Sequence, residues 1–262
     1  MITAGCDIGS LTGKVVIMED EELISKIIIP ATPKATQTAT HAMDLALKEA
    51  KLDLDKIDYI LGTGYGREKI PFANSSVTEI SCHAMGAHWA LPTLRTVIDI
   101  GGQDNKVISV DDRGKVKDFV MNDKCAAGAG RFLEVMAAAL GLKLEELGPI
   151  GLESKEPAII TSQCTVFAET EVVSLIADDI KLADIVSGIN KSVAERIISQ
   201  VKKIRWEKDI AVTGGVGKNT GVVSFLEAAL EMIKRVPVDP QLVGAIGAAV
   251  IAKDLLTDGV QN

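Results

Sequence analysis

The chain has 262 residues, of which 28 are lysine or arginine and 36 are aspartate or glutamate, giving a formal net charge of −8. A hydrophobic fraction of 47% excludes a disordered chain, while the acidic balance and an aromatic fraction of 3% argue against a nucleic-acid-binding protein. The longest stretch without a charged side chain, 80–94, is shorter than the ~20 apolar residues that cross a bilayer, so we expect a soluble, cytoplasmic protein without a membrane partner.

The first part of the chain is predicted to alternate strands with helices. Apolar runs at 2–6 and 15–18 flank a glycine-containing turn, and a third strand is expected at 23–29. Apolar residues at helical spacing then predict a helix over 38–51, which a short strand at 59–63 follows. A further helix is expected over 80–91, because Pro92 ends it.

The second part repeats this order and adds more helices. Apolar runs at 95–98 and 107–110 flank another glycine-containing turn, and a strand is expected at 116–121. Three helices follow, then a strand that enters a glycine-rich turn, and two final helices. The expected ranges are 126–140, 169–177 and 183–203 for the first three helices, 209–213 for the strand, and 224–234 and 241–256 for the last two helices.

An internal repeat relates the two parts at an offset of 92 residues. Residues 7–20 read DIGSLTGKVVIMED and residues 99–112 read DIGGQDNKVISVDD. A supersecondary unit repeated this far apart predicts two similar α/β halves rather than a solenoid. We expect halves of 1–93 and 94–262, with the last helix packing back on the first half. The identical pairs are Asp7/Asp99, Ile8/Ile100, Gly9/Gly101, Lys14/Lys106, Val15/Val107 and Asp20/Asp112.

The two repeated turns have the chemistry of phosphate sites. Glycines expose backbone N–H groups that can cradle phosphate oxygens, and a lysine adds a point charge. Carboxylates at the strand ends are suited to hold hydrated Mg²⁺. The candidate residues are Asp7, Gly9, Ser10, Thr12 and Lys14 in the first turn, and Asp99, Gly101, Gly102 and Gln103 in the second.

A third glycine-rich turn, TGGVGKN at 213–219, follows an apolar strand. Its glycines would let a nucleoside lie flat against the backbone at Gly214, Gly215 and Val216. It is not a P-loop, because Val212 stands at the first glycine position and Asn219 replaces the serine or threonine after the lysine.

The four cysteines, Cys6, Cys82, Cys125 and Cys164, include no CxxC pair, so neither a zinc ribbon nor a redox dithiol is indicated. Cys6 lies in the first strand and is expected to be a buried apolar residue. Cys82 and the adjacent His83 are interpreted as packing residues rather than as a metal site.

The motifs together resemble a known family of ATPases. DxGS, DIGGQD and TGGV resemble the two phosphate motifs and the adenosine motif of the actin and sugar-kinase superfamily. Within it, the chain is similar to the activators of 2-hydroxyacyl-CoA dehydratases and the ATPase subunits of benzoyl-CoA reductases. That similarity is carried by GTGYGR (62–67), EISCHAMGA (79–87), IDIGGQD (98–104), NDKCAAGAGRFLEVMA (122–137), QCTVFAETEV (163–172) and VTGGVG (212–217).

The resemblance implies a duplicated actin/sugar-kinase-like α/β fold with a nucleotide cleft between its halves. It also implies that Cys125 and Cys164 are ligands of a 4Fe–4S cluster. Such a cluster takes four thiolates, and two chains would supply them, so we expect a homodimer with the cluster on its axis. Two residues depart from the family pattern: Ala129 replaces a frequent threonine, and Leu11 replaces a frequent hydroxyl residue in the first turn.

The resulting hypothesis is an ATP-driven one-electron donor. A ferredoxin or flavodoxin would reduce the cluster, and ATP hydrolysis would drive transfer to a 2-hydroxyacyl-CoA dehydratase, a benzoyl-CoA reductase or a double-cubane protein. Asp7 and Asp99 would organise Mg²⁺ and water, and Gln103 would orient the attacking water. Two alternatives stay open at this point: a sugar or small-acid kinase of the same superfamily, and a nucleotide-dependent sensor or scaffold.

Overall fold

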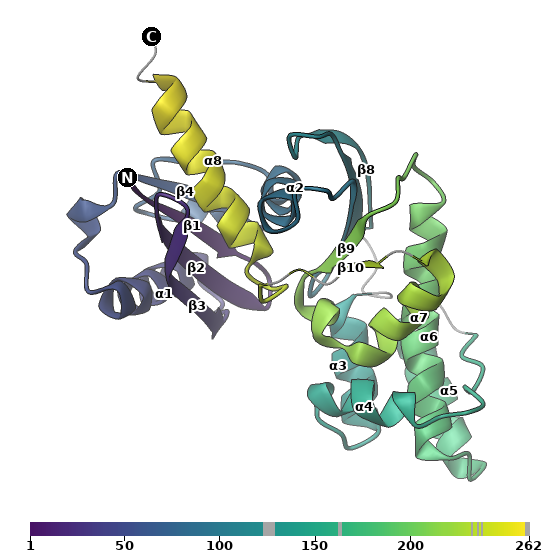
Figure 1. Ribbon diagram of the computed structural model, residues 1–262. Helices are drawn as coiled ribbons and strands as arrows, with labels where there is room; N and C mark the ends of the chain where they lie inside the picture. The colour runs from purple at the N-terminus through teal and green to yellow at the C-terminus, as the bar shows by residue number, and fades with distance from the viewer. Residues whose placement is uncertain (123–128, 162–163, 232, 235, 237, 260–262) are drawn as a thin grey trace. The chain divides into compact units, whose positions relative to one another are not determined.

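The computed structural model describes the chain except for residues 123–128, 162–163, 232, 235, 237 and 260–262 (Figure 1). The described chain divides into two compact units. The first comprises 1–95, 110–117 and 236–262, and the second comprises 96–109 and 118–235.

The first sheet contains β1 (Ile2–Ile8), β2 (Thr12–Glu19), β3 (Glu22–Pro30), β4 (Tyr59–Thr63) and β5 (Ser75–Ser76). Their spatial order is β3-β2-β1-β4-β5. The central strand β1 pairs antiparallel with β2 and parallel with β4. The predicted strands at 23–29 and 59–63 are present, and the two-residue β5 is the strand of this sheet that the sequence pattern does not predict.

Helices cover both faces of the first sheet. They are α1 (Ala35–Ala50), α2 (Glu79–Ala90) and α8 (Val243–Gly259). Because successive side chains of a strand point to opposite faces, Val15 and Ile17 of β2 share a buried cluster with α1, whereas Val16 and Met18 share one with α8. Burial on both faces explains why β2 reads as a continuous apolar run.

Glycines bring α8 unusually close to β1 and α2. A Cβ on Gly5 of β1 would collide with the carbonyl of Ala245, and one on Gly247 of α8 would collide with the carbonyl of Cys82 in α2. A Cβ on Gly86 would likewise collide with the carbonyl of Val243. The backbone of α8 therefore packs directly on two neighbours, and this packing fixes α2 relative to β1 in the first unit.

Replacing Gly247 by alanine is expected to destabilise the fold. The added methyl group meets backbone atoms, which cannot rotate away, so we expect a loss of about 1–3 kcal/mol or more in the free energy of unfolding. Denaturant unfolding of Gly247→Ala measures it. Leu255→Ala on the same helix is the control, because Leu255 is exposed and its truncation should change stability by about 0.5 kcal/mol or less. Equal midpoints for the two variants would contradict the close packing of α8.

The second sheet repeats the topology of the first. It contains β6 (Thr96–Ile100), β7 (Asn105–Val110), β8 (Val116–Asn122), β9 (Ile210–Thr213) and β10 (Ile233–Lys234), in the order β10-β9-β6-β7-β8. The central strand β6 pairs antiparallel with β7 and parallel with β9, as β1 does with β2 and β4. The repeated sheet order confirms the duplication that the sequence repeat predicts.

The second unit has one large core formed by its helices and sheet. Its helices are α3 (Gly130–Ala139), α4 (Leu147–Leu152), α5 (Thr165–Ala177), α6 (Leu182–Val201) and α7 (Thr220–Leu230). Phe132 and Leu133 of α3 share this core with Ala168 and Val172 of α5. Four short 3₁₀ helices complete the described elements, at Leu54–Lys56, Arg67–Lys69, Leu144–Glu146 and Gly215–Lys218.

Several predicted boundaries are corrected by the structure. The helix expected over 224–234 is α7, which begins earlier because the Asn219 side chain accepts a hydrogen bond from the Val222 N–H, 3.0 Å away, and caps it. The end of that range is β10 instead. The predicted start of the 126–140 helix lies outside the described residues. None of the described helices is long and apolar enough to cross a bilayer.

Candidate functional site

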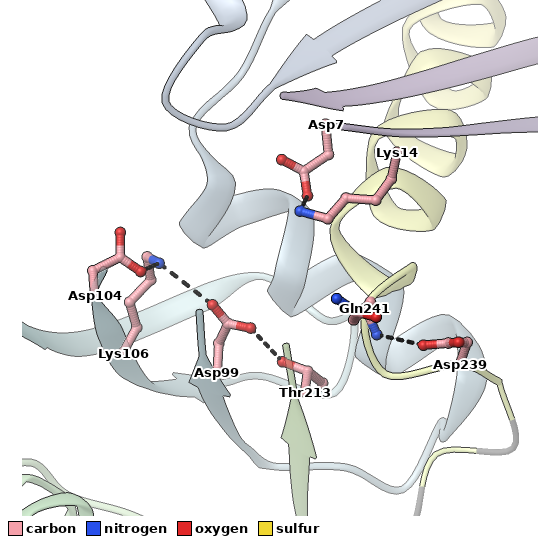
Figure 2. A network of polar contacts seen from close by, with 8 residues as sticks. All are labelled: Asp7, Lys14, Asp99, Asp104, Lys106, Thr213, Asp239 and Gln241. Carbon is pink, nitrogen blue, oxygen red and sulfur yellow. Dashed lines mark hydrogen bonds and ion pairs between the residues drawn. The ribbon is translucent and has the colours of Figure 1, made fainter. Parts of the chain in front are cut away.

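The first repeated turn joins β1 to β2 in the first unit. The N–H of Gly9 donates to the Thr12 carbonyl at 3.0 Å and closes the hairpin. Antiparallel register places Asp7 opposite Lys14, whose Nζ lies 3.0 Å from Asp7 Oδ2 (Figure 2). Asp7 is buried, whereas Ser10 at the tip of the turn is exposed. The turn thus combines a buried ion pair with an exposed tip.

The second turn, between β6 and β7, has the same construction in the second unit. The N–H of Gly101 donates to the Asp104 carbonyl at 3.0 Å, and the register places Asp99 opposite Lys106. Lys106 Nζ lies 3.4 Å from Asp99 Oδ2 and 2.6 Å from Asp104 Oδ1 (Figure 2). Gln103 is exposed at the tip. The aspartate and lysine of the sequence repeat are therefore ion-pair partners in each half.

The third turn lies beside the second, because β9 runs parallel to β6. Thr213 is in register with Asp99, and its hydroxyl donates to Asp99 Oδ1 at 2.9 Å (Figure 2). Gly214 follows with φ of 82°, and a Cβ there would lie 2.8 Å from the same oxygen. Gly215 is exposed and Val216 is buried. The structure thus brings this turn against the second one within the second unit.

Sequence reasoning missed three residues of these turns. Lys106 occupies the position of Lys14 in the repeat, so the repeat itself contained the signal for it. Asp104 has no counterpart in the first turn, where Thr12 stands. Thr213 is 114 positions from Asp99, and only the pairing of β6 with β9 brings them together.

The cysteines lie in two kinds of environment. Cys6 and Cys82 are fully buried, as expected for packing residues; burial raises the pKa of Cys6 strongly and that of Cys82 to about 12. Cys164 is exposed and immediately precedes α5 as its N-cap residue. Cys125 lies outside the described residues. Within the described part of the chain, no group of three or more histidine, cysteine or acidic residues could hold a metal ion.

The two similar halves form the duplicated α/β fold of actin-like and sugar-kinase-like ATPases. Residues 4–252 match the model of the BadF/BadG/BcrA/BcrD ATPase family, and the chain belongs to this family.

The sequences of several relatives align with nearly the whole chain. The activator of lactoyl-CoA dehydratase from Anaerotignum propionicum is 42% identical over 252 residues, covering 96% of this chain and 97% of that protein. The crystal structure of component A of (R)-2-hydroxyglutaryl-CoA dehydratase from Acidaminococcus fermentans matches with a TM-score of 0.94 and 40% identity, covering 98% of this chain and 99% of the other.

The solved structure of another relative contains a bound nucleotide analogue. The activator of the 2-hydroxyisocaproyl-CoA dehydratase from Clostridium difficile, with bound ADPNP, matches with a TM-score of 0.94 and 40% identity. The match covers 100% of this chain and 97% of that one. The chain is therefore an ATPase of the dehydratase-activator family.

Proposed function

We propose that this protein is an ATP-driven one-electron donor for a 2-hydroxyacyl-CoA dehydratase or a related reductase. The active form is a homodimer that holds one 4Fe–4S cluster. When bound, the cluster would accept one electron from a ferredoxin or flavodoxin and pass it to the acceptor, coupled to hydrolysis of ATP to ADP and phosphate. The observation that carries the proposal is 42% identity over nearly the full length to an activator of lactoyl-CoA dehydratase.

The donor set of the chain fits a cluster shared by two subunits. Cys164 is exposed at the start of α5, where the N–H groups of the first turn and the positive end of the helix dipole would stabilise an anionic cluster. The buried Cys6 and Cys82 are poor ligands, because burial disfavours their ionised forms. Cys125 is the second proposed ligand of each chain. Two chains then supply the four thiolates that a cubane cluster takes.

The surface next to Cys164 supports the dimer. α5 exposes four apolar side chains, from Val166, Phe167, Val173 and Ile176, of which Phe167 is 67% exposed. An apolar patch on one helix is a candidate protein interface. A symmetric interface would use the same patch on both copies, so that α5 of each subunit and its cysteine approach a common axis.

Backbone hydrogen bonds link the second turn to the start of α3, which begins five residues after Cys125 in the sequence. The N–H groups of Gly130 and Arg131, at the start of α3, donate to the carbonyls of Gly101 and Gly102 at 2.8 and 2.7 Å. A shift of this turn would therefore displace the start of α3. α3 also packs on α5 through the common core. We propose that nucleotide chemistry at the turn reaches both cysteines through these two helices.

The residues of the turns have distinct proposed roles toward ATP. The first turn binds phosphate oxygens through Ser10, Thr12 and Lys14 and the backbone at Gly9, because N–H, hydroxyl and ammonium groups are phosphate donors. Asp7 and Asp99 hold Mg²⁺ and its waters, and Gly101 and Gly102 bind phosphate. Gln103 orients the attacking water. The nucleoside lies against Gly214, Gly215 and Val216. A cluster, when bound, supplies a centre that takes up and releases one electron.

Purification without oxygen tests the proposal. We expect about four irons per dimer and ATP-dependent reduction of a dehydratase when reduced ferredoxin is supplied. Electron transfer without ATP would contradict the coupling. An iron-free monomer that cannot be reconstituted with iron and sulfide would overturn the proposal as a whole.

A further inference from the structure

The two halves hold their site carboxylates at equivalent positions. Asp7 of β1 is in register with Thr63 of β4, as Asp99 of β6 is with Thr213 of β9. A glycine with positive φ follows each threonine, Gly64 at 86° and Gly214 at 82°. A Cβ at either glycine would crowd Oδ1 of the neighbouring aspartate. The turn GTGYGR is thus the counterpart of VTGGVG in the first unit.

The threonines of the two turns differ in what they bind. Thr213 donates its hydroxyl proton to Asp99 Oδ1 at 2.9 Å. Thr63 donates its hydroxyl proton to the carbonyl of Val77, also at 2.9 Å. A hydroxyl has a single proton, so Thr63 does not donate to Asp7 in this arrangement. Asp7 is instead held by the Lys14 ammonium, 3.0 Å from its Oδ2.

His83 of α2 occupies the space beside Asp7. The point where a Cβ of Gly244 would stand lies 2.8 Å from His83 Nε2 and 3.2 Å from Asp7 Oδ2. His83 is only 6% exposed, and Asp7 is 4% exposed. The imidazole and the carboxylate therefore both border the buried space that Gly244 leaves, next to the Asp7–Lys14 ion pair.

The position of His83 is fixed by the backbone. The carbonyl of Cys82, the preceding residue, packs against Gly247 of α8 so closely that no side chain would fit. Gly244, one turn earlier on α8, leaves the space that His83 and Asp7 share. The glycines of α8 thus hold α2 where its histidine reaches the end of β1.

We infer that His83, beside Lys14, is a positioning residue of the Asp7 carboxylate, because its Nε2 and Asp7 Oδ2 border the same buried space left by Gly244. This inference rests on the proposed role of Asp7 in ATP hydrolysis. In this role His83 does not bind phosphate itself. It would set the direction in which the Asp7 carboxylate oxygens face Mg²⁺ and water.

The test compares three substitutions of His83 in the complete dimer. Glutamine places an amide N–H near the position of Nε2, asparagine places it near Nδ1, and leucine removes the polar group. We expect the kcat of ATP hydrolysis to stay near that of the unsubstituted protein in His83→Gln. It should fall about 10- to 100-fold in His83→Asn and His83→Leu, the usual cost of losing a group that orients a ligand. His88→Gln, on the same helix, is the matched control and should leave kcat unchanged.

A double variant of His83 and Asp7 distinguishes a positioning role of His83 from a role in packing alone. If His83 acts only through Asp7, the double variant Asp7→Asn with His83→Leu should be no slower than Asp7→Asn alone. The inference would be overturned if the losses in kcat of the two single variants add in the double variant. It would also be overturned if His83→Leu is fully active while Asp7→Asn is inactive. Either result leaves the proposed function intact. Full activity in Asp7→Asn itself would instead remove the proposed role of Asp7. Equal losses in His83→Gln and His83→Leu would also overturn the inference, because the amide should replace Nε2.

Discussion

Replacing Cys164 by serine is expected to reduce the iron content from about four atoms per dimer to background. A serine oxygen at neutral pH is a protonated alcohol and cannot replace a thiolate ligand. Both subunits carry the change, so half of the proposed ligands disappear at once. Because Cys164 is exposed and lies outside the core, the fold should be retained, although the dimer should loosen.

Iron analysis and molar mass of protein purified without oxygen measure this result. Cys82→Ala is the matched control, since Cys82 of α2 is buried against α8 in the first unit and its replacement should leave the iron content unchanged. Binding of ADP by Cys164→Ser shows that the fold is retained. A full complement of iron in Cys164→Ser would remove this residue from the ligand set. The same change at Cys125 is expected to have the same effect.

Replacing Asp99 by asparagine is expected to lower the kcat of ATP hydrolysis about 100- to 1,000-fold while the iron content stays unchanged. The substitution removes the charge that is proposed to hold Mg²⁺ and water but keeps an oxygen for the Thr213 hydroxyl. Lys106 is nearly buried and would be costly to leave unpaired. It retains Asp104 at 2.6 Å, so the fold should survive.

Steady-state ATPase rates at saturating ATP and Mg²⁺ test this prediction. Asp112→Asn is the control, because Asp112 is an exposed carboxylate just beyond β7 with no proposed role at the turn. An Asp99→Asn variant with unchanged kcat would show that its carboxylate takes no part in hydrolysis. A variant that has lost both iron and activity would indicate unfolding, which circular dichroism detects separately.

Exposed apolar residues explain one error in the sequence prediction. The helix expected over 169–177 begins at Thr165 in the structure. The sequence pattern missed its first turn because Val166 and Phe167, although apolar, are exposed there. Apolar residues on an exposed face disturb the amphipathic period that predicts a helix. These exposed apolar side chains of α5 belong to the surface that we propose to be covered by the second subunit.

The sequence by itself determined the repeated hairpins and the duplicated fold. These features depend on local chemistry: a short glycine-containing turn sets the register of two antiparallel strands, and that register places Asp7 opposite Lys14. The repeat then extends the same arrangement to Asp99 and Lys106.

Only the tertiary structure decided which groups surround those carboxylates. Thr213 reaches Asp99 across 114 positions, and His83 and Gly244 come from two helices to the space beside Asp7. Parallel pairing and helix packing are set by many side chains over long sequence separations, and they leave no periodic pattern near the residues that they bring together. The buried surroundings of Asp7 and Asp99 could therefore be known only after the strands and helices were packed.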